Sequence, residues 1–232
     1  MNLYVGTSGF SYKEWKGSFY PKTLPAQQML RYYGERFRSV EINSTFKRLP
    51  TSSVLKAWAK AVDANFKFAL KASEQITHFR RLKGAGPLIS DLFGVAAALK
   101  KRLGPVLFQL PPNFKKDVAR LREFLALLPS RRRAALEFRH ASWFDDEVFA
   151  LLREQRVALC IADAEGDLEV PFVATAAWGY LRLRRLDYSA AALKTWAKRL
   201  RTQAWRDAFV FFKHEDEGKG PTLAKRFLKL AG

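Results

Sequence analysis

The sequence predicts a single α/β domain over residues 1–232, folded as a TIM-barrel-like (β/α)8 protein. Short β-rich runs recur roughly every 20 to 40 residues, and stretches with helical periodicity separate most of them. Eight such runs are present, and eight parallel strands close a (β/α)8 barrel. An open doubly wound sheet is the alternative, but the first run is followed by Gly6-Thr7-Ser8-Gly9 instead of the dinucleotide-binding pattern G-x-G-x-x-G.

The expected strands are short runs dominated by apolar, β-branched and aromatic residues, as is typical of strands in parallel sheets. They span residues 3–6, 39–42, 66–71, 106–110, 134–138, 157–162, 179–183 and 209–213. Because parallel strands of a barrel all run in one direction, we expect the last residues of these runs to gather on one face of the protein.

Each expected helix opens at a residue that commonly starts helices and continues with apolar residues on one face. The opening residues, in order, are Leu24-Pro25, Thr51, Pro87, Asp117, Asp145, Ser189 and Pro221. The sixth connection, residues 163–177, contains Gly166 and Pro171 and is too short for a helix with two loops. We therefore expect one irregular connection between the sixth and seventh strands.

Composition and charge exclude several classes of protein. With 48% hydrophobic and 14% aromatic residues, the chain can bury a core and is not disordered, and the single cysteine, Cys160, excludes a disulfide scaffold. No apolar run is long enough to span a bilayer, and the first residues lack the pattern of a signal peptide, so we expect a cytoplasmic protein with no membrane partner. The net charge is +19, and the first 116 residues carry 20 basic and 6 acidic side chains. A chain this basic attracts polyanions at low salt, whatever its task.

Polar side chains interrupt the expected strands close to their C-terminal ends. Strand alternation places the polar residues on the inward face, opposite the apolar ones. They are Glu41 and Asn43, Lys67 and Lys71, Gln109, Glu137 and Arg139, Tyr180 and Arg182, and Lys213-His214. A buried ion network is one interpretation of this pattern. Because several polar groups converge on the rim where TIM barrels carry their active sites, we favour a functional site.

The residues at this rim suggest a site for an anionic small molecule, such as a phosphorylated sugar or a nucleotide. Glu41, Glu137 and Lys71 are the candidate catalytic residues, because a carboxylate among cations can act as a general base. The candidate substrate-binding residues are Thr7, Ser8, Asn43, Gln109, Arg139, Trp143 and Arg182. Glu41, Glu137, Asp163 and a histidine could hold a metal, but no H-x-H or H-E-x-x-H spacing is present, so we assign no metal ligand and identify no cofactor.

Two further features leave alternatives open. The long first loop contains Phe10, Tyr12, Trp15, Phe19 and Tyr20, which could either stack on a ligand or cover the barrel, and its start could present backbone N–H groups to an anion. Three basic clusters occur at 80–83, 100–102 and 131–133. Such runs are usually solvated surface, and they support nucleic-acid binding only if several lie on one face.

Five segments together are similar to one known family. GTSGFSYKEWKGSFYP, VEINSTFKRLP, FALKASEQITH, GPVLFQLPPNF and ALEFRHASWF resemble the YecE-like family, the domain of unknown function numbered seventy-two, from Leu3 to about Pro221. The resemblance implies a TIM-barrel-like fold and no established activity. The polar positions that match the family are Thr7, Ser8, Glu41, Asn43, Thr45, Lys71, Gln109, Glu137, Arg139 and Trp143.

The chain also departs from the family pattern at three places. Lys47 stands where relatives usually have an aromatic residue, Arg184-Arg185 replaces a His-Gly pair, and Lys213 to Asp216 replaces an Asn-rich stretch. We therefore assign no family role to His214.

Three hypotheses of function follow from these observations. The first is an enzyme that acts on an anionic small molecule at the C-terminal face of the barrel. The second is a nucleic-acid-binding or nuclease-like barrel, and the third is a non-catalytic interaction module. The sequence does not decide whether the protein is an enzyme, and it does not give the oligomeric state.

Overall fold

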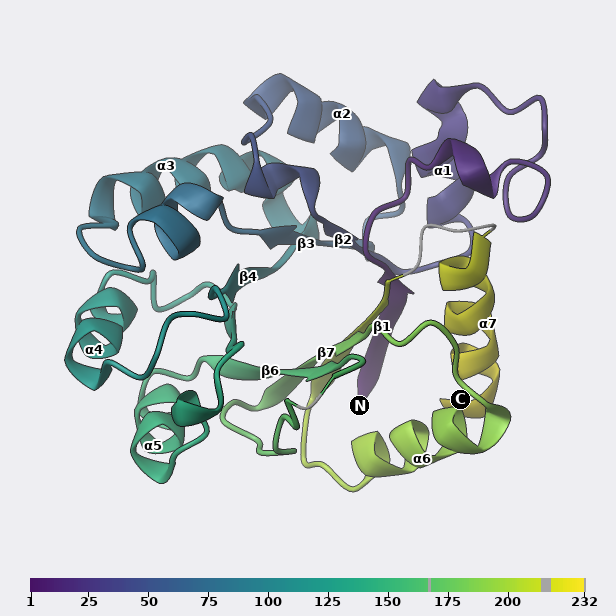
Figure 1. Cartoon of the computed structure of the whole chain (residues 1–232). Helices are drawn as coiled ribbons and strands as arrows, with labels where there is room; N and C mark the ends of the chain where they lie inside the picture. Colours follow the sequence, from purple (N-terminus) through teal and green to yellow (C-terminus); the bar gives the residue numbers. More distant parts are fainter. Residues whose placement is uncertain (167, 214–217, 232) are drawn as a thin grey trace.

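Parallel strands surround a central axis, and the helices pack around the outside of the strands (Figure 1). The computed structural model describes residues 1–166, 168–213 and 218–231. In that part of the chain the sheet has eight strands in the order β1-β8-β7-β6-β5-β4-β3-β2. The strands are β1 (Asn2–Thr7), β2 (Ser39–Ile42), β3 (Lys67–Lys71), β4 (Leu103–Gln109), β5 (Ala134–Glu137), β6 (Ala158–Asp163), β7 (Trp178–Leu183) and β8 (Asp207–Phe212). The predicted (β/α)8 fold is confirmed.

The strand ends differ from the sequence expectation by up to three residues. The largest difference is in β4, which begins at Leu103 and so includes Gly104-Pro105. The register between β3 and β4 shifts at this place, and Gly104 lies close to the backbone of Phe68. An irregular pairing of this kind accommodates glycine and proline inside a strand, which a pattern of apolar residues does not reveal.

Four helices begin directly after their predicted opening residues, and the other three begin within a few residues of theirs. They are α1 (Met29–Gly34, preceded by a 3₁₀ turn at Ala26–Gln28), α2 (Ser52–Ala61), α3 (Gly86–Ala96), α4 (Val118–Ala126), α5 (Asp146–Glu154), α6 (Ala190–Arg201) and α7 (Lys219–Ala231). Thr51, Asp117, Asp145 and Ser189 each accept a hydrogen bond from a backbone N–H of the first turn that follows. The last helix begins at Lys219, two residues before Pro221, so Pro221 lies in its first turn, where proline is tolerated.

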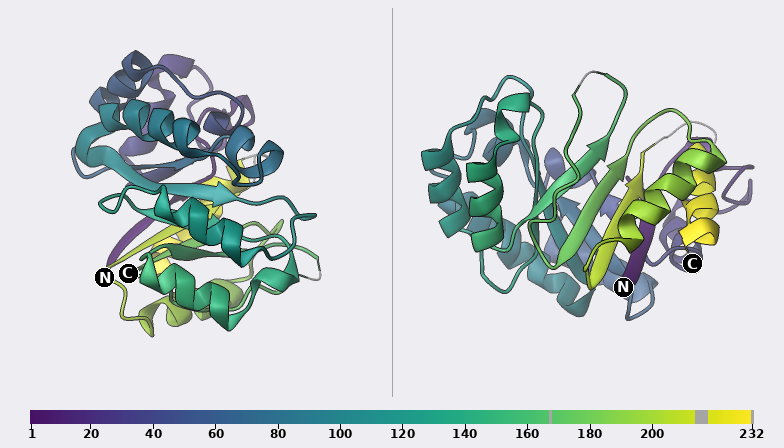
Figure 2. Two further views of the ribbon diagram at one scale, coloured as in Figure 1. Left: turned by 90° about the vertical axis from the view of Figure 1, so that its left-hand side faces the viewer. Right: turned by 90° about the horizontal axis from the view of Figure 1, so that it is seen from below.

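The connection from β6 to β7 contains no helix among its described residues, as its length predicted, and it extends beyond the strand ends (Figure 2). Thr175 holds this segment against the barrel. Its buried hydroxyl accepts a hydrogen bond from the backbone N–H of Leu159 at 2.7 Å and donates one to the carbonyl oxygen of Val157 at 2.8 Å. One side chain thus ties the connection to the start of β6 in the absence of a packed helix.

The barrel closes between β1 and β2 with little strand pairing. The two strands share a single bridge, between Ser8 and Glu41. Below it the hydroxyl of Tyr33 accepts a hydrogen bond from the backbone N–H of Thr7 at 2.8 Å and donates one to the carbonyl oxygen of Ser39 at 3.0 Å. Gly6 allows this approach, because a Cβ at Gly6 would collide with the Ser39 carbonyl and the Tyr33 hydroxyl. A tyrosine from α1 therefore replaces part of the hydrogen-bond ladder.

Apolar side chains fill the barrel below its C-terminal end. Two large clusters lie between the strands and the surrounding helices, and a third fills the interior of the barrel. The interior cluster consists of Ala69, Leu107, Ala135, Ala158, Cys160, Trp178, Tyr180, Phe209 and Phe211. The barrel is therefore packed rather than open, and the inward side chains nearest the C-terminal end lie on an apolar floor.

We expect Tyr33→Phe to lower the free energy of unfolding by about 1–3 kcal/mol, because a buried N–H and a buried carbonyl lose their shared partner. Urea denaturation measures the change. Tyr32→Phe is the matched control, since the Tyr32 hydroxyl makes no hydrogen bond within the described residues and its loss should change stability little. Equal stabilities of the two variants would contradict the role of Tyr33 in closing the barrel.

Candidate functional site

A buried ion triad lies at the C-terminal end of the barrel interior. Arg182 on β7 lies between Glu41 on β2 and Glu137 on β5. Its Nη2 lies 2.9 Å from Glu41 Oε1, and its Nη1 lies 2.7 Å from Glu137 Oε2. Both carboxylates are 0% exposed and the guanidinium side chain is 2% exposed. One arginine therefore bridges three strands across the barrel.

Glu41 has three hydrogen-bond donors. Besides Arg182, the hydroxyl of Ser8 donates to Glu41 Oε1 at 2.7 Å, and the hydroxyl of Tyr180 donates to Glu41 Oε2 at 2.7 Å. The donors come from the end of β1 and from β7, so they fix the carboxylate from both sides. Full burial with three donors holds Glu41 as a rigid counter-charge to Arg182.

Glu137 lies among arginines. Its Oε1 is 2.5 Å from Arg139 Nη2 and 4.0 Å from Arg184 Nη1, and its Oε2 is bound by Arg182. Burial alone would raise the pKa of Glu137, but the charges of Arg182 and Arg139 hold this pKa below its ordinary value. Burial alone would lower the pKa of Arg182, but the charges of Glu137 and Glu41 raise this pKa well above its usual range.

Lys71, at the end of β3, is the cation in this group with the weakest hold on its proton. Burial, followed by the charge of Arg182, lowers the pKa of Lys71 to about 8, against the opposing effect of Glu137 and Glu41. Its Nζ lies 4.1 Å from the centre of the Phe46 ring. Thr45 fixes the segment that carries Phe46, because its hydroxyl contacts the carbonyl oxygen of Lys71 at 2.6 Å. A lysine with such a pKa can exchange a proton near neutral pH.

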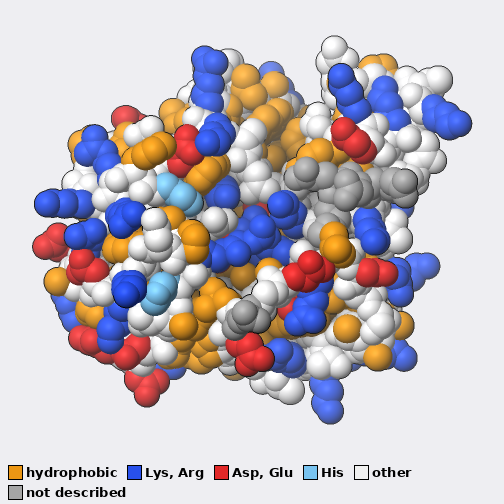
Figure 3. Space-filling model, in the orientation of Figure 1, with side chains coloured by type: hydrophobic (Ala, Val, Ile, Leu, Met, Phe, Trp, Pro, Cys, Tyr) orange, Lys and Arg blue, Asp and Glu red, His pale blue; other side chains and the backbone are white. Residues whose placement is uncertain are grey.

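These residues form a cluster that we call the mouth cluster: Glu41, Lys71, Gln109, Glu137, Arg139, Arg182 and Arg184. Among its described members, four cations face two carboxylates, so the cluster carries a formal excess of two positive charges. Figure 3 shows lysine and arginine side chains gathered in a hollow at the centre of this face. The excess charge makes the mouth of the barrel attractive to an anion.

The structure brings together most of the predicted site residues. Ser8, Glu41, Lys71, Gln109, Glu137, Arg139 and Arg182 lie in or against the mouth cluster. Asn43 lies just beyond β2 and lines a neighbouring pocket. Their individual roles stay predictions.

Two predicted binding residues are not brought to the cluster. Trp143 is fully buried, stacks on Phe138 at 4.7 Å and donates its indole N–H to the carbonyl oxygen of Phe114 at 2.6 Å. Thr7 is buried at the seam between β1 and β2, where its hydroxyl contacts Tyr33 and the carbonyl oxygen of Gly9. Both residues act in packing and in closing the barrel.

The expectation that the first loop presents backbone N–H groups to an anion is wrong. The N–H of Thr7 donates to Tyr33, that of Ser8 to the carbonyl oxygen of Phe212, and that of Gly9 to the carbonyl oxygen of Glu41 at 2.7 Å. These N–H groups therefore form hydrogen bonds that close the barrel. The positive φ of 94° at Gly9 then turns the chain outward over the rim.

The residues considered for a metal site lie apart. Asp163 binds Arg185 at 2.6 Å and the indole N–H of Trp196 at 3.1 Å, away from the two glutamates. Within the described ranges, no three His, Cys, Asp or Glu side chains gather closely enough to hold a metal ion. His214 and the altered segment up to Asp216 lie outside the described residues.

Sequence reasoning missed two residues of the site. Alternation placed Tyr180 on the inward face, and the structure adds its hydrogen bond to Glu41. Arg184 follows β7 at the same alternation as Arg182, so alternation continued past the strand could have identified it. Phe46 gives no comparable signal, because its approach to Lys71 depends on a short 3₁₀ turn after β2.

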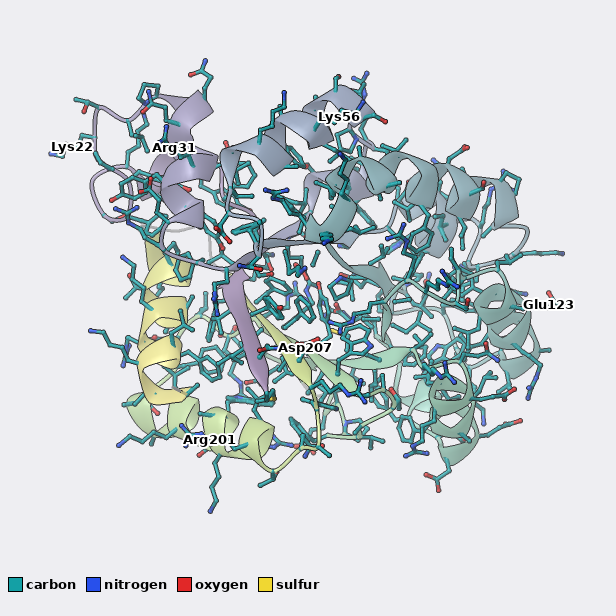
Figure 4. All side chains as sticks on the ribbon, turned by 180° about the vertical axis from the view of Figure 1, so that it is seen from behind. Lys22, Arg31, Lys56, Glu123, Arg201 and Asp207 are labelled. Atoms are coloured by element: carbon teal, nitrogen blue, oxygen red, sulfur yellow. The ribbon has the colours of Figure 1, made fainter. Side chains whose placement is uncertain are left out.

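The basic clusters are divided between the two ends of the barrel. Residues 80–83 follow β3 and lie on the C-terminal side, whereas 100–102 and 131–133 precede β4 and β5 and lie at the N-terminal end. There Arg133 forms an ion pair with Asp207, which is labelled in the view from behind (Figure 4). Within the described residues, no helix has the length and hydropathy of a membrane span.

Comparisons with known proteins agree with the fold and with the sequence motifs. A model of the family described as protein of unknown function DUF72 matches residues 4–232. The protein YunF of Bacillus subtilis, assigned to UPF0759, is 26% identical, with 98% of this chain and 94% of YunF covered. The crystal structure of a DUF72 family protein from Thermotoga maritima superposes with a TM-score of 0.89 at 27% identity, with 99% of each chain covered. A DUF72 family protein from Enterococcus faecalis shares the fold with a TM-score of 0.81 at 19% identity, with 99% of this chain and 95% of that chain covered.

We expect Arg182→Met to lower the free energy of unfolding by about 3–5 kcal/mol at pH 8, because two buried carboxylates lose their common partner. The loss should be smaller at pH 5. In the native protein the pKa of Glu137 is lowered, so its ion pairs contribute stability that is lost only as the pH falls through that lowered pKa. Loss of Arg182 removes the largest charge that lowers the pKa of Glu137, so this pKa rises and protonation relieves part of the cost as the pH falls.

Urea denaturation at both pH values measures this effect. The control is Arg122→Met, which removes an exposed arginine 3.9 Å from Glu154 and should change stability by no more than about 0.5 kcal/mol. An Arg182→Met variant as stable as Arg122→Met, or equally destabilised at both pH values, would contradict the triad.

Proposed function

We propose that this chain, which belongs to the family described as protein of unknown function DUF72, is an enzyme that binds a small anionic substrate at the C-terminal mouth of its barrel. Membership of this family confirms the resemblance noted in the sequence and brings no established activity with it. The proposal therefore rests on the mouth cluster, and on one observation above all, its excess of positive charge.

The arginines of the mouth cluster retain capacity for a ligand. The Nε groups of Arg139 and Arg182 are buried and make no hydrogen bond with any part of the chain that the structure describes. Buried donors without partners cost free energy, which an incoming acceptor recovers. Guanidinium groups match the oxygens of phosphate and carboxylate in geometry as well as in charge. Arg139 is partly exposed, so it is the first contact that we assign to the anion.

Lys71 is the group that we propose for proton transfer. Its pKa of about 8 leaves about a tenth of Lys71 neutral at pH 7, and this neutral form can take a proton from a bound substrate and return it. A neighbouring substrate anion would raise this pKa, and the surrounding arginines would limit the rise.

The carboxylates suit a different role. Glu41 and Glu137 are fully buried and bound to arginines, so we propose that they hold Arg182 and Arg139 in place. The sequence-based assignment of Glu41 and Glu137 as catalytic carboxylates stays a prediction.

Nucleic-acid binding is the second candidate function. The observation that favours it is that two of the three basic clusters, 100–102 and 131–133, lie at the same, N-terminal end of the barrel. A polyanion bound there would lie at the opposite end from Lys71 and could not reach the proposed proton-transfer group. We therefore rank it below the small-molecule enzyme. The interaction-module hypothesis stays untested.

The anion site can be tested with inorganic phosphate as the probe. We expect phosphate to bind the wild-type protein by isothermal titration calorimetry and expect Arg139→Gln to weaken the binding about tenfold or more, because it removes a charge-assisted contact. Arg132→Gln is the matched control: it removes the same charge at the N-terminal end and should bind phosphate as the wild type does. Equal affinities of the two variants would show that the site lies elsewhere.

The state of Lys71 can be tested by chemical labelling. The rate of reductive methylation of Lys71 can be followed against pH by mass spectrometry of peptides. We expect this rate to have its midpoint near pH 8, well below that of an ordinary lysine, because burial and Arg182 disfavour the charged form. In Arg139→Gln the midpoint should rise, since a nearby positive charge is lost. A Lys71 midpoint above about pH 10 in the wild type would rule out its proposed role.

A further inference from the structure

A pocket with aromatic walls lies beside the mouth cluster. It has a volume of about 600 Å³ and lies between the first loop, α1 and α2. Its lining includes Gly9, Phe10, Tyr12, Leu30, Asn43 and Trp58. Figure 3 shows hydrophobic side chains in a cleft at the rim of this face, which leads toward the cationic hollow. The volume suits a small ring system and is too limited for a macromolecule.

The first loop divides its aromatic residues between two tasks. Trp15, Phe19 and Tyr20 are buried and cover the barrel beside α1. Phe10 and Tyr12 remain partly exposed and line the pocket. The sequence left covering and binding as alternatives for this loop, and the structure assigns different residues to each.

Trp58 on α2 gives the pocket a fixed flat wall. Its ring packs edge to face against Phe10 at 6.1 Å and stacks on Phe68 at 6.1 Å. Contacts on two sides hold the indole in one orientation, although the residue is still partly exposed. An indole held in this way is a suitable surface for stacking a planar ring.

One polar atom of the pocket has no partner. The side-chain oxygen Oδ1 of Asn43 is buried and accepts no hydrogen bond from the residues that the structure describes. A buried acceptor without a donor is costly, and a ligand that carries an N–H or O–H group would satisfy it. The pocket therefore combines a stacking surface with an acceptor, as is suited to a heterocyclic ring.

The pocket and the mouth cluster are continuous along two strands. Gly9 directly follows Ser8, whose hydroxyl binds Glu41, and Asn43 lies two residues beyond Glu41, just after the end of β2. A ligand bound in the pocket could therefore extend past Ser8 and Glu41 toward the cations of the mouth cluster.

We infer that the substrate is a nucleoside monophosphate or a close analogue, in which an anionic group is joined to a planar heterocycle, and not a phosphorylated sugar alone. This inference rests on the proposed function, since it assumes that the mouth cluster binds the anion. It adds that the neighbouring pocket provides the specificity, through stacking on Trp58 and a hydrogen bond to Asn43.

Calorimetry with four kinds of ligand tests the inference: inorganic phosphate, ribose 5-phosphate, adenosine and the four common ribonucleoside monophosphates. At least one monophosphate should bind about tenfold or more tightly than ribose 5-phosphate, which has the same phosphate and sugar but no base. Trp58→Ala should reduce that affinity to the level of ribose 5-phosphate and leave the affinity for ribose 5-phosphate unchanged. Arg139→Gln should weaken the binding of both phosphorylated ligands.

A filling variant provides a second test if Trp58→Ala fails to fold. Ala57→Leu places a larger side chain in the pocket from an exposed position on α2. It should weaken the binding of the monophosphate without affecting the binding of ribose 5-phosphate. Equal affinities of ribose 5-phosphate and every monophosphate would overturn the inference and leave the proposed function standing. Adenosine binding as tightly as the monophosphates would also overturn it. Failure of all phosphorylated ligands to bind would overturn both.

Discussion

Arg182 lies inside the barrel between two carboxylates that have no contact with water, and the arrangement of the site depends on this contact. Moving an ion out of water costs several kcal/mol, which is offset only when the charges meet at close range and their remaining hydrogen-bonding groups are satisfied. Ser8, Tyr180 and Gln109 extend the network around Arg182 and its partners, although the Nε of Arg182 makes no hydrogen bond within the described residues. The need to satisfy these buried groups fixes β2, β5 and β7 relative to one another at the end where the site forms.

The triad also separates groups that stay ionised from a group that titrates near neutral pH. Its two carboxylates are bound to arginines, and the pKa of Glu137 is held below its ordinary value. Lys71 is partly exposed, and burial, followed by the charge of Arg182, lowers its pKa. The mouth thus combines a rigid positive field with one group that exchanges a proton near neutral pH. This division of roles is the physical basis for the proposed anion-binding enzyme.

The alternation of side chains along a strand allowed much of this to be predicted. Alternation with a period of two placed Glu41, Lys71, Glu137, Arg139 and Arg182 on the inward face, and the eight strand runs indicated the barrel. The features that escaped prediction depend on contacts between distant segments. Tyr33 closes the seam between β1 and β2 because Gly6 lets a helix side chain approach β2. The N–H groups of Thr7 and Gly9 donate hydrogen bonds at that seam, and the N–H of Ser8 donates to β8. Trp143 was predicted to bind the substrate, but in the structure its ring stacks on Phe138 as part of the packing.

The most direct test of the account is a carbon-13 NMR titration of the Glu137 side-chain carboxyl, assigned by comparison with Glu137→Gln. If Arg182 and Arg139 keep Glu137 ionised, its resonance should stay constant from about pH 9 down to the ordinary glutamate range near pH 4.3 and should titrate below it. A carboxyl that takes up a proton between about pH 6 and pH 8 would behave as a general acid or base. That result would contradict the claim that Glu137 is a fixed counter-charge and that Lys71 carries the proton.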